Sequence, residues 1–157
     1  LNNRLTGFSL DPHSPNIIAP GKRPAHTLNA FTAVHPDGSL YLVGGTPGAN
    51  IQVQSNLQLL INVIDLKMNV QEATEAPRWQ HLNAAGQSSE EEKGAGVLEI
   101  ENRVSAEVLE QLRAKGHEVK ALSAWGHGSS VQMMEVLANG TFAFGSDPRC
   151  EGQACGI

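Results

Sequence analysis

With 157 residues, the chain has the size of one domain, and its composition excludes several classes of protein. Lys and Arg number 11 against 16 Asp and Glu, and the net charge of -5 offers no basic surface to a nucleic-acid backbone. The longest apolar stretch is interrupted by Gln58, Asn62 and Asp65 and is shorter than the ~20 residues that a membrane-spanning helix needs. We therefore expect neither a nucleic-acid partner nor a membrane span.

The aromatic content of 4% is low for a chain that must build a core. Val, Ile, Leu and Ala therefore have to supply most of the buried surface. The shortage of aromatic side chains is easier to explain if the chain also packs against a partner. An ordinary small α+β domain that folds alone is the alternative.

A loop and a β-hairpin are predicted first along the chain. Four prolines between residues 11 and 27 fix φ or remove an amide N–H at too many positions for a helix or a central strand, so we expect an ordered loop or a linker. Residues 28–34 and 39–43 have a β-like composition, and the intervening Asp37-Gly38 supplies the positive φ of a hairpin turn.

Two helices are predicted next. Apolar residues recur at helical spacing over residues 51–66, and additional Leu and Val residues leave little of this helix polar, so we expect it to be buried on most sides. Asn69 stands three residues before Glu72, which is the spacing of an N-cap and its reciprocal glutamate. A second, short helix should therefore begin at Asn69 and end before Pro77.

The second half of the chain predicts a loop, a strand-helix-strand unit and a hairpin. Residues 83–94 have nothing to bury and predict a solvated loop, with a functional acidic patch as the lesser alternative. Residues 97–101 and 118–122 predict strands around a helix that Ser105 caps and Gly116 ends. The last predicted element is a hairpin around Asn139-Gly140, with strands over 130–137 and 141–144.

The glycine-rich loop from Gly44 to Asn50 is the first candidate site. A loop that leaves a strand and opens a helix directs backbone N–H groups to one place, which suits an oxyanion in acyl transfer or a phosphate. The alternative is that the glycines only permit a tight turn. Spacing alone favours this alternative, because neither G-x-G-x-x-G nor a Walker lysine is present.

Other reactive side chains give weaker signals. The histidines lack the spacing of zinc ligands, and we expect no metal site and no cofactor. Ser129 follows Gly126-His127-Gly128 and resembles an activated serine, but G-x-S-x-G is absent. Cys150 and Cys155 could form a disulfide in an oxidising compartment or remain two free thiols, and the sequence does not decide between them.

Two blocks, residues 44–50 and Asn69–Trp79, together resemble the small subunit of a gamma-glutamyltranspeptidase. With the opening Asn2-Asn3 and the ending at residues 146–149 and 152–157, the resemblance spans nearly the whole chain. It implies an α+β fold that is part of the four-layer αββα sandwich of the N-terminal-nucleophile hydrolases. The chain is then a single domain fragment, the C-terminal part of the small subunit. In it, residues 1–27 form the substrate-site loop region and residues 28–157 the sheet and helix core.

The same resemblance implies particular site residues. Gly48 and Ala49 fall on the two glycines whose N–H groups form the oxyanion hole, and alanine retains its N–H. Arg4 and Gly7 fall where typical members have Gln or Glu and Asp, which hold the α-amino group of the substrate. In this chain Arg4 places a cation at the first position, and Gly7 removes the carboxylate at the second. An acyl donor that carries a carboxylate next to these residues, or that lacks the α-amine, therefore fits better. A solvated surface arginine is the alternative for Arg4.

The segment Pro20 to Thr27 resembles the family segment in which two serines bind the substrate α-carboxylate. Those serines fall on His26 and Thr27. Thr27 keeps a hydroxyl donor, and His26 offers an imidazole or is an ordinary loop histidine.

The resemblance also implies a reaction and partners. Family members cleave themselves to expose a threonine that attacks a γ-glutamyl or related amide, whereas this chain begins with Leu1. We therefore expect these residues alone to be inactive and to need the large subunit and the remaining N-terminal part of the small subunit of the same precursor. The family implies a periplasmic or extracellular location, and a cytoplasmic one stays open. A non-catalytic relative or fragment that binds a ligand or partner is the alternative.

Overall fold

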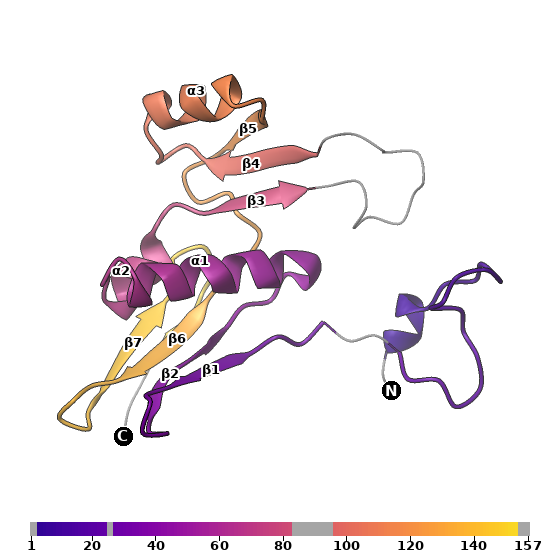
Figure 1. Ribbon diagram of the computed structural model, residues 1–157, viewed down its shortest axis with the longest axis horizontal. Helices are drawn as coiled ribbons and strands as arrows, with labels where there is room; N and C mark the ends of the chain where they lie inside the picture. Colours follow the sequence, from indigo (N-terminus) through magenta and orange to yellow (C-terminus); the bar gives the residue numbers. More distant parts are fainter. Residues whose placement is uncertain (1–2, 25–26, 83–95, 154–157) are drawn as a thin grey trace.

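The computed structural model describes residues 3–24, 27–82 and 96–153, which form two β-sheets and the helices that join them (Figure 1). One sheet has four strands in the order β1-β2-β6-β7, and the other has three in the order β3-β4-β5. In Figure 1 the two sheets lie on different sides of helix α1. Helices and strands are both well represented, so the chain is α+β, as the sequence predicted.

The four-stranded sheet is antiparallel throughout. Its strands are β1 (Phe31–Val34), β2 (Leu40–Gly45), β6 (Gln132–Val136) and β7 (Phe142–Ser146). Both predicted hairpins are confirmed, and their turn glycines, Gly38 and Gly140, have φ of 86° and 80°. A residue with a Cβ is strained at such angles, which is why Asp-Gly and Asn-Gly mark the turns in the sequence.

Helices α1 (Gln52–Ile64) and α2 (Val70–Glu75) pack on this sheet. The predicted capping box is confirmed: Asn69 Oδ1 accepts from the Glu72 N–H at 2.9 Å, and the Asn69 N–H donates to Glu72 Oε2 at 3.0 Å. Seven apolar residues form the core between helices and sheet: Leu42, Leu59, Val63, Val70, Ala73, Val131 and Met133. A Cβ at Gly145 would collide with the Val70 carbonyl, so the absence of a side chain there lets α2 approach β7.

The three-stranded sheet contains β3 (Trp79–Leu82), β4 (Val97–Glu101) and β5 (Glu118–Leu122). Strands β4 and β5 are parallel and are joined through α3 (Ala106–Ala114), which confirms the predicted strand-helix-strand unit. Ser105 caps α3 through the Val108 N–H at 3.3 Å, and Gly116 follows it with a φ of 93°. The predicted acidic loop at 83–94 lies outside the described residues.

Glutamine side chains cover one edge of each sheet, β3 in one and β7 in the other. Gln58 accepts from the Trp79 N–H at 3.1 Å and donates to the Trp79 carbonyl at 2.9 Å, and Gln54 makes the same two bonds with His81 at 2.7 and 3.0 Å. Gln71 repeats the pattern on Ser146 of β7, with two bonds of 3.0 Å. A side-chain amide has one donor and one acceptor side, so each glutamine satisfies one residue of an edge strand as a neighbouring strand would.

Helix α1 departs from the expectation that it is buried on most sides. Polar side chains, including Gln52, Ser55 and Gln58, lie on its buried sides, whereas Val53 and Leu57 are 64% and 53% exposed. Among the polar residues of α1, Gln54 and Gln58 bind the backbone of β3 and Asn56 Nδ2 donates to the Asn29 carbonyl, while no described element covers the opposite side of the helix. None of the described helices is long and apolar enough to cross a membrane.

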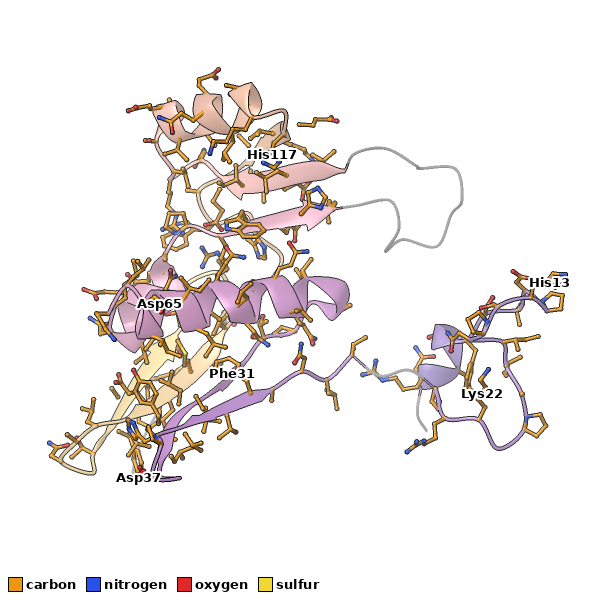
Figure 2. All side chains as sticks on the ribbon, in the orientation of Figure 1. His13, Lys22, Phe31, Asp37, Asp65 and His117 are labelled. Carbon is orange, nitrogen blue, oxygen red and sulfur yellow. The ribbon has the colours of Figure 1, made fainter. Side chains whose placement is uncertain are left out.

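The N-terminal segment, residues 3–24, folds on itself and stands apart from the two sheets (Figure 1). Figure 2 shows His13 and Lys22 within this segment, away from Phe31 and Asp37 of the β1–β2 hairpin. Lys22 Nζ donates to the carbonyls of Pro15 and Ile17 at 2.6 and 3.1 Å. These bonds close the proline-rich stretch into an ordered loop, which is one of the two alternatives that the sequence left open, the other being a linker.

Candidate functional site

The glycine-rich loop connects β2 to a 3-10 turn, η2 (Ala49–Ile51), that continues directly into α1. The predicted strand-loop-helix arrangement is therefore confirmed. The first N–H groups of a helix have no partner within the helix, and the helix dipole adds positive potential at that end. Gly48 and Ala49 lie at this helix start, where backbone N–H groups can bind an anion.

Gly48 and Ala49 both have positive φ, at 131° and 47°. A Cβ at Gly48 would lie 2.6 Å from Ile51 Cγ1, so only glycine fits there without movement. Ala49 occupies the left-handed region, which costs a residue with a Cβ about 1–2 kcal/mol. The loop therefore holds a conformation that favours glycine at both positions and tolerates alanine at one.

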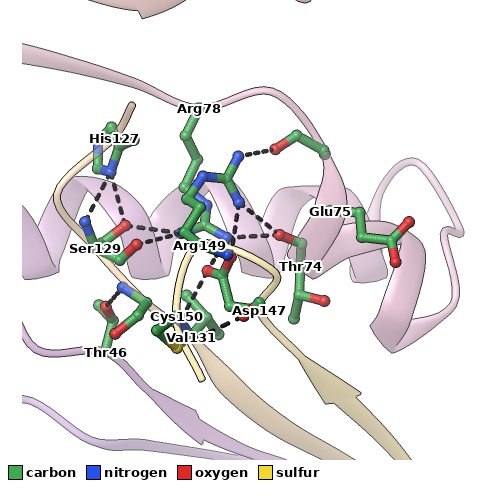
Figure 3. A network of polar contacts seen from close by, with 12 residues as sticks. Thr46, Thr74, Glu75, Arg78, His127, Ser129, Val131, Asp147, Arg149 and Cys150 are labelled. Carbon is green, nitrogen blue, oxygen red and sulfur yellow. Dashed lines mark hydrogen bonds and ion pairs between the residues drawn. The ribbon is translucent and has the colours of Figure 1, made fainter. Parts of the chain in front are cut away.

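Thr46 ties this loop to the segment before β6. Its Oγ1 donates to the Pro47 carbonyl at 2.8 Å and accepts from the Ser130 N–H at 3.0 Å. Next to Ser130, Ser129 Oγ lies 2.8 Å from His127 Nδ1 (Figure 3). The conformation of the glycine loop thus depends on a second loop, residues 126–130, that is remote in the sequence.

A buried group of charged residues, here called the ionic cluster, holds that second loop, and Figure 3 shows three of its members, Arg78, Asp147 and Arg149. It consists of Arg78, Glu101, Asp147 and Arg149, with Arg103 at its margin. The side chains of Arg78, Glu101, Asp147 and Arg149 are at most 2% exposed. Their two positive and two negative charges balance, as buried charges require.

The contacts of the ionic cluster join both sheets and a helix end. Arg78 pairs with Asp147 and donates to Ser129 Oγ at 2.8 Å, while Arg149 binds both oxygens of Glu101 at 2.5 and 2.6 Å. Both arginines also donate to the Thr74 carbonyl, at 2.6 and 3.0 Å. Because Thr74 is near the end of α2, these bonds satisfy a carbonyl that the helix leaves without a partner.

The cluster also sets the charge state of its acids. Burial alone would raise the pKa of Glu101, but hydrogen bonds from Arg149, the Arg78 N–H and Arg103 outweigh it and lower that pKa to about 2. Burial is likewise outweighed at Asp147, whose pKa is lowered by N–H groups of Val131 and Arg149 and by Arg78. Both carboxylates are therefore ionised at neutral pH.

His127 is neutral in this environment. Burial and the positive charge of Arg78 lower its pKa to about 4, against an opposing effect of Glu101. The Ser129 N–H donates to His127 Nδ1 at 3.1 Å, so this nitrogen is an acceptor. Ser129 is 1% exposed, and its hydroxyl receives a bond from Arg78, so no substrate reaches it. The serine-histidine pair orders the loop and is not a nucleophilic site.

The N-terminal candidates are partly brought together. Arg4 Nη1 donates to Thr27 Oγ1 at 3.1 Å although 23 residues separate them. Gly7 is exposed, and its carbonyl accepts from Asn16 Nδ2 at 2.6 Å. His26 lies outside the described residues. Arg4 and Gly7 belong to the segment that stands apart in Figure 1, so these residues do not gather around Gly48 and Ala49.

Residue type alone did not reveal the ionic cluster. Arg78 belongs to the Asn69–Trp79 block and Asp147 to the ending at residues 146–149, and both stretches contributed to the family resemblance. The two residues are, however, 69 positions apart, and neither stands in a recognised catalytic spacing. The signal in the sequence that could have predicted the cluster is Glu101, which ends a strand and has buried neighbours. A charged residue in a buried position needs a partner.

Two smaller predictions concern metals and thiols. Among residues 3–24, 27–82 and 96–153, no group of three His, Cys, Asp or Glu is arranged to hold a metal ion. Cys150 Sγ lies 3.6 Å from the Asp147 carbonyl oxygen. Cys155 lies outside the described residues, so the choice between a disulfide and two thiols stays open.

Fold and site together define a class of protein. In this chain helices cover one face of a sheet and a glycine loop opens the first helix. Its structural neighbours are N-terminal-nucleophile hydrolases, so the chain is part of the αββα sandwich of that class. Cephalosporin acylase from Bacillus halodurans superposes on 96% of the chain with a TM-score of 0.81 and 30% identity, and the chain covers 26% of that protein.

The family follows from the sequence comparisons. The model of the family "Gamma-glutamyltranspeptidase" matches residues 1–157, and the chain belongs to this family. It is 35% identical to the glutathione hydrolase proenzyme of Escherichia coli over 95% of the chain and 25% of that relative. It is also 35% identical to the oxamate amidohydrolase proenzyme of Klebsiella pneumoniae, over 98% of the chain and 28% of that relative. The chain thus spans about a quarter of the length of these relatives.

Proposed function

We propose that these residues are part of an enzyme that transfers or hydrolyses γ-glutamyl or related glutaryl amides through an acyl-enzyme. In this proposal the nucleophile is a threonine of the remaining polypeptide, whose free α-amine, exposed by cleavage of the precursor, acts as base. Gly48 and Ala49 stabilise the tetrahedral oxyanion, and water or an amine then releases the acyl group. The observation that carries the proposal is the pair of backbone N–H groups of Gly48 and Ala49, both at positive φ, at the start of η2.

Arg4, Gly7, His26 and Thr27 bind the acyl donor in this proposal. A guanidinium with a hydroxyl 3.1 Å away suits a carboxylate, which accepts from both, and disfavours an ammonium. One relative supports such a donor: oxamate, which its name specifies, has a carboxylate and no α-amine. The partners are the large subunit and the remaining N-terminal part of the small subunit of the precursor, and no cofactor takes part.

Substitution at Gly48 in the intact enzyme tests the oxyanion site. Gly48→Ala forces the loop to move, because its Cβ would meet Ile51 and a φ of 131° is unfavourable. We expect kcat for a glutaryl anilide to fall by about 10²–10³-fold, as when an oxyanion donor is lost. Ala49→Gly is the matched control, since it keeps the N–H and relieves the strain, and it should retain kcat. An unchanged kcat in correctly assembled Gly48→Ala contradicts the proposal.

The purified residues 1–157 should not turn over a γ-glutamyl or glutaryl anilide. Turnover by these residues alone would require a nucleophile other than an N-terminal threonine and would overturn the mechanism.

A further inference from the structure

A cavity of about 600 Å³ lies between α3 and the three-stranded sheet. Leu98 and Ile100 line it from β4, and Val108 and Leu112 line it from α3. Among the described residues, its lining includes neither the glycine loop nor the ionic cluster. Sites for small molecules have volumes of about 300–1,000 Å³ and mostly apolar walls with a few polar groups. The cavity matches such a site in size and in lining.

The described part of the chain leaves this cavity unfilled. No residue of α3 is buried, and Val108 is 42% exposed although it lies on the side of the helix that lines the cavity. Residues 83–95, which connect β3 to β4 and lie outside the described residues, contain no aromatic residue and no Leu, Ile, Val or Met. They therefore offer no large apolar side chain that could fill the cavity.

Two histidines supply the polar groups of the cavity. His81 belongs to β3, and His117 lies in the turn between α3 and β5 (Figure 2). Among the described residues, no hydrogen bond reaches either imidazole ring. Two imidazoles without partners beside apolar walls can fix the orientation of a bound molecule.

The two rings lie close to the same position, Gly96, just before β4 begins. A Cβ at Gly96 would lie 2.6 Å from His81 Cε1, so the His81 ring lies over this glycine. Val97 pairs with Glu118 in the parallel register, which makes His117 the neighbour of Gly96 on the other side. Alternate residues of a strand share a face, so Gly96 is on the same face as Leu98. The missing side chain at Gly96 therefore leaves open space between the two imidazoles.

We propose that this cavity binds a small organic acid with an apolar body. The body contacts Leu98 and Val108, and the carboxylate accepts from the ring N–H groups of His81 and His117. A carboxylate fits better than a neutral head group, because it has two oxygens for the two rings and gains a charge-assisted bond from a protonated imidazole. No Asp or Glu among the described lining residues repels it. The inference does not depend on the proposed reaction.

Calorimetric titration of the intact protein with 6-phenylhexanoate tests the site. We expect a Kd of about 1 mM or lower, and binding at least about tenfold weaker in Val108→Trp, whose ring enters the cavity. Glu110→Trp adds the same ring on the exposed side of α3 and should bind like the wild type. Equal binding by Val108→Trp would place the acid elsewhere and overturn the proposal. Absence of binding to the wild type would mean that another part of the protein fills the cavity, and it also overturns the proposal.

The neutral counterpart 6-phenylhexan-1-ol tests the role of the imidazoles. The wild type should bind the acid about tenfold more tightly than the alcohol, because hydrogen bonds to a charged group are the stronger ones. His81→Leu with His117→Leu should remove this preference, and His13→Leu, in the N-terminal segment, should retain it. A preference that survives the double change would overturn the assignment of the two histidines.

Photolabelling locates the bound acid without any substitution. An analogue of 6-phenylhexanoate that carries a diazirine should, on irradiation with the intact wild-type protein, label peptides from residues 97–112. Labelling that is confined to other peptides would overturn the proposal.

Discussion

Two regions of the molecule hold their polar groups in opposite ways. One is the junction between the two sheets, and the other is the N-terminal segment. At the junction, Arg78 and Asp147 are buried and pair across 69 residues of sequence. In the N-terminal segment, Lys22 is exposed and bonds a carbonyl only seven residues away. Removing a partner at the junction leaves a charge without water or counter-ion, whereas the N-terminal segment can exchange a lost bond for water. The junction therefore constrains the fold, whereas residues of the N-terminal segment can change at little cost in stability.

The largest effect is expected at Glu101. Glu101→Gln removes the negative charge that faces Arg149 and Arg103 and should lower the free energy of unfolding by about 3–5 kcal/mol, as breaking a buried ion pair does. Denaturant unfolding of the intact protein measures this. Glu110→Gln, which breaks the exposed pair with Arg113, should change stability by less than about 1 kcal/mol. Similar losses of unfolding free energy in both variants would mean that the ionic cluster stabilises the fold no more than a surface ion pair does.

Acidification tests the same junction without loss of a partner. The pKa of His127 is lowered to about 4 from its ordinary 6.5, so between these values the unfolded chain binds a proton that the folded chain does not. Stability should therefore fall by about 3 kcal/mol as the pH drops from 6.5 to 4, and at lower pH Glu101 adds a further loss. The measurement is the free energy of unfolding against pH.

His127→Asn isolates this contribution, because its amide oxygen can accept from the Ser129 N–H but does not titrate. The variant should lose most of the slope between pH 6.5 and 4, whereas His13→Asn, in the exposed N-terminal segment, should retain it. A slope that is unchanged in His127→Asn would assign the acid sensitivity to other groups.

Substitutions in the N-terminal segment should change the preference between acyl donors and leave the stability of the protein unchanged. Since Arg4 would repel the ammonium of a γ-glutamyl donor, the intact enzyme should prefer glutaryl over γ-glutamyl amides by about a hundredfold in kcat/KM. Arg4→Gln with Gly7→Asp should shift the preference back towards γ-glutamyl and leave the unfolding transition unchanged. Kinetics with both donors and both enzymes measures this. A wild-type enzyme that already favours γ-glutamyl amides shows that Arg4 does not face the donor.

The smallest effect is expected at the glutamines that cover the sheet edges. Gln58→Leu keeps the bulk of the side chain but leaves the Trp79 N–H and carbonyl without their α1 partner, at a cost of about 1–3 kcal/mol. Gln111→Leu, on the exposed side of α3, should cost less than about 0.5 kcal/mol. Equal stabilities of the two variants would show that water replaces Gln58 at the edge of β3.

Short-range signals in the sequence determined many of the turns and helix ends of this protein. The turn glycines Gly38 and Gly140, the Asn69 capping box and the Ser105 cap act within a few residues, and each predicted element around them is observed. The glycine loop also lies where the sequence placed it, between a strand and a helix. Such features depend on the φ preference of one residue or on one short hydrogen bond, so the sequence displays them directly.

Only the tertiary structure decided which distant side chains meet. Nothing in the spacing of Arg78, Glu101 and Asp147 predicts a common site, because their partners are selected by how the two sheets and α2 pack. The polar and apolar sides of α1 were decided in the same way: the strand edge at β3 needs the glutamines, and the apolar residues face outward. A buried charge or an unpaired strand edge needs a partner wherever the fold brings one, and sequence distance does not limit that choice.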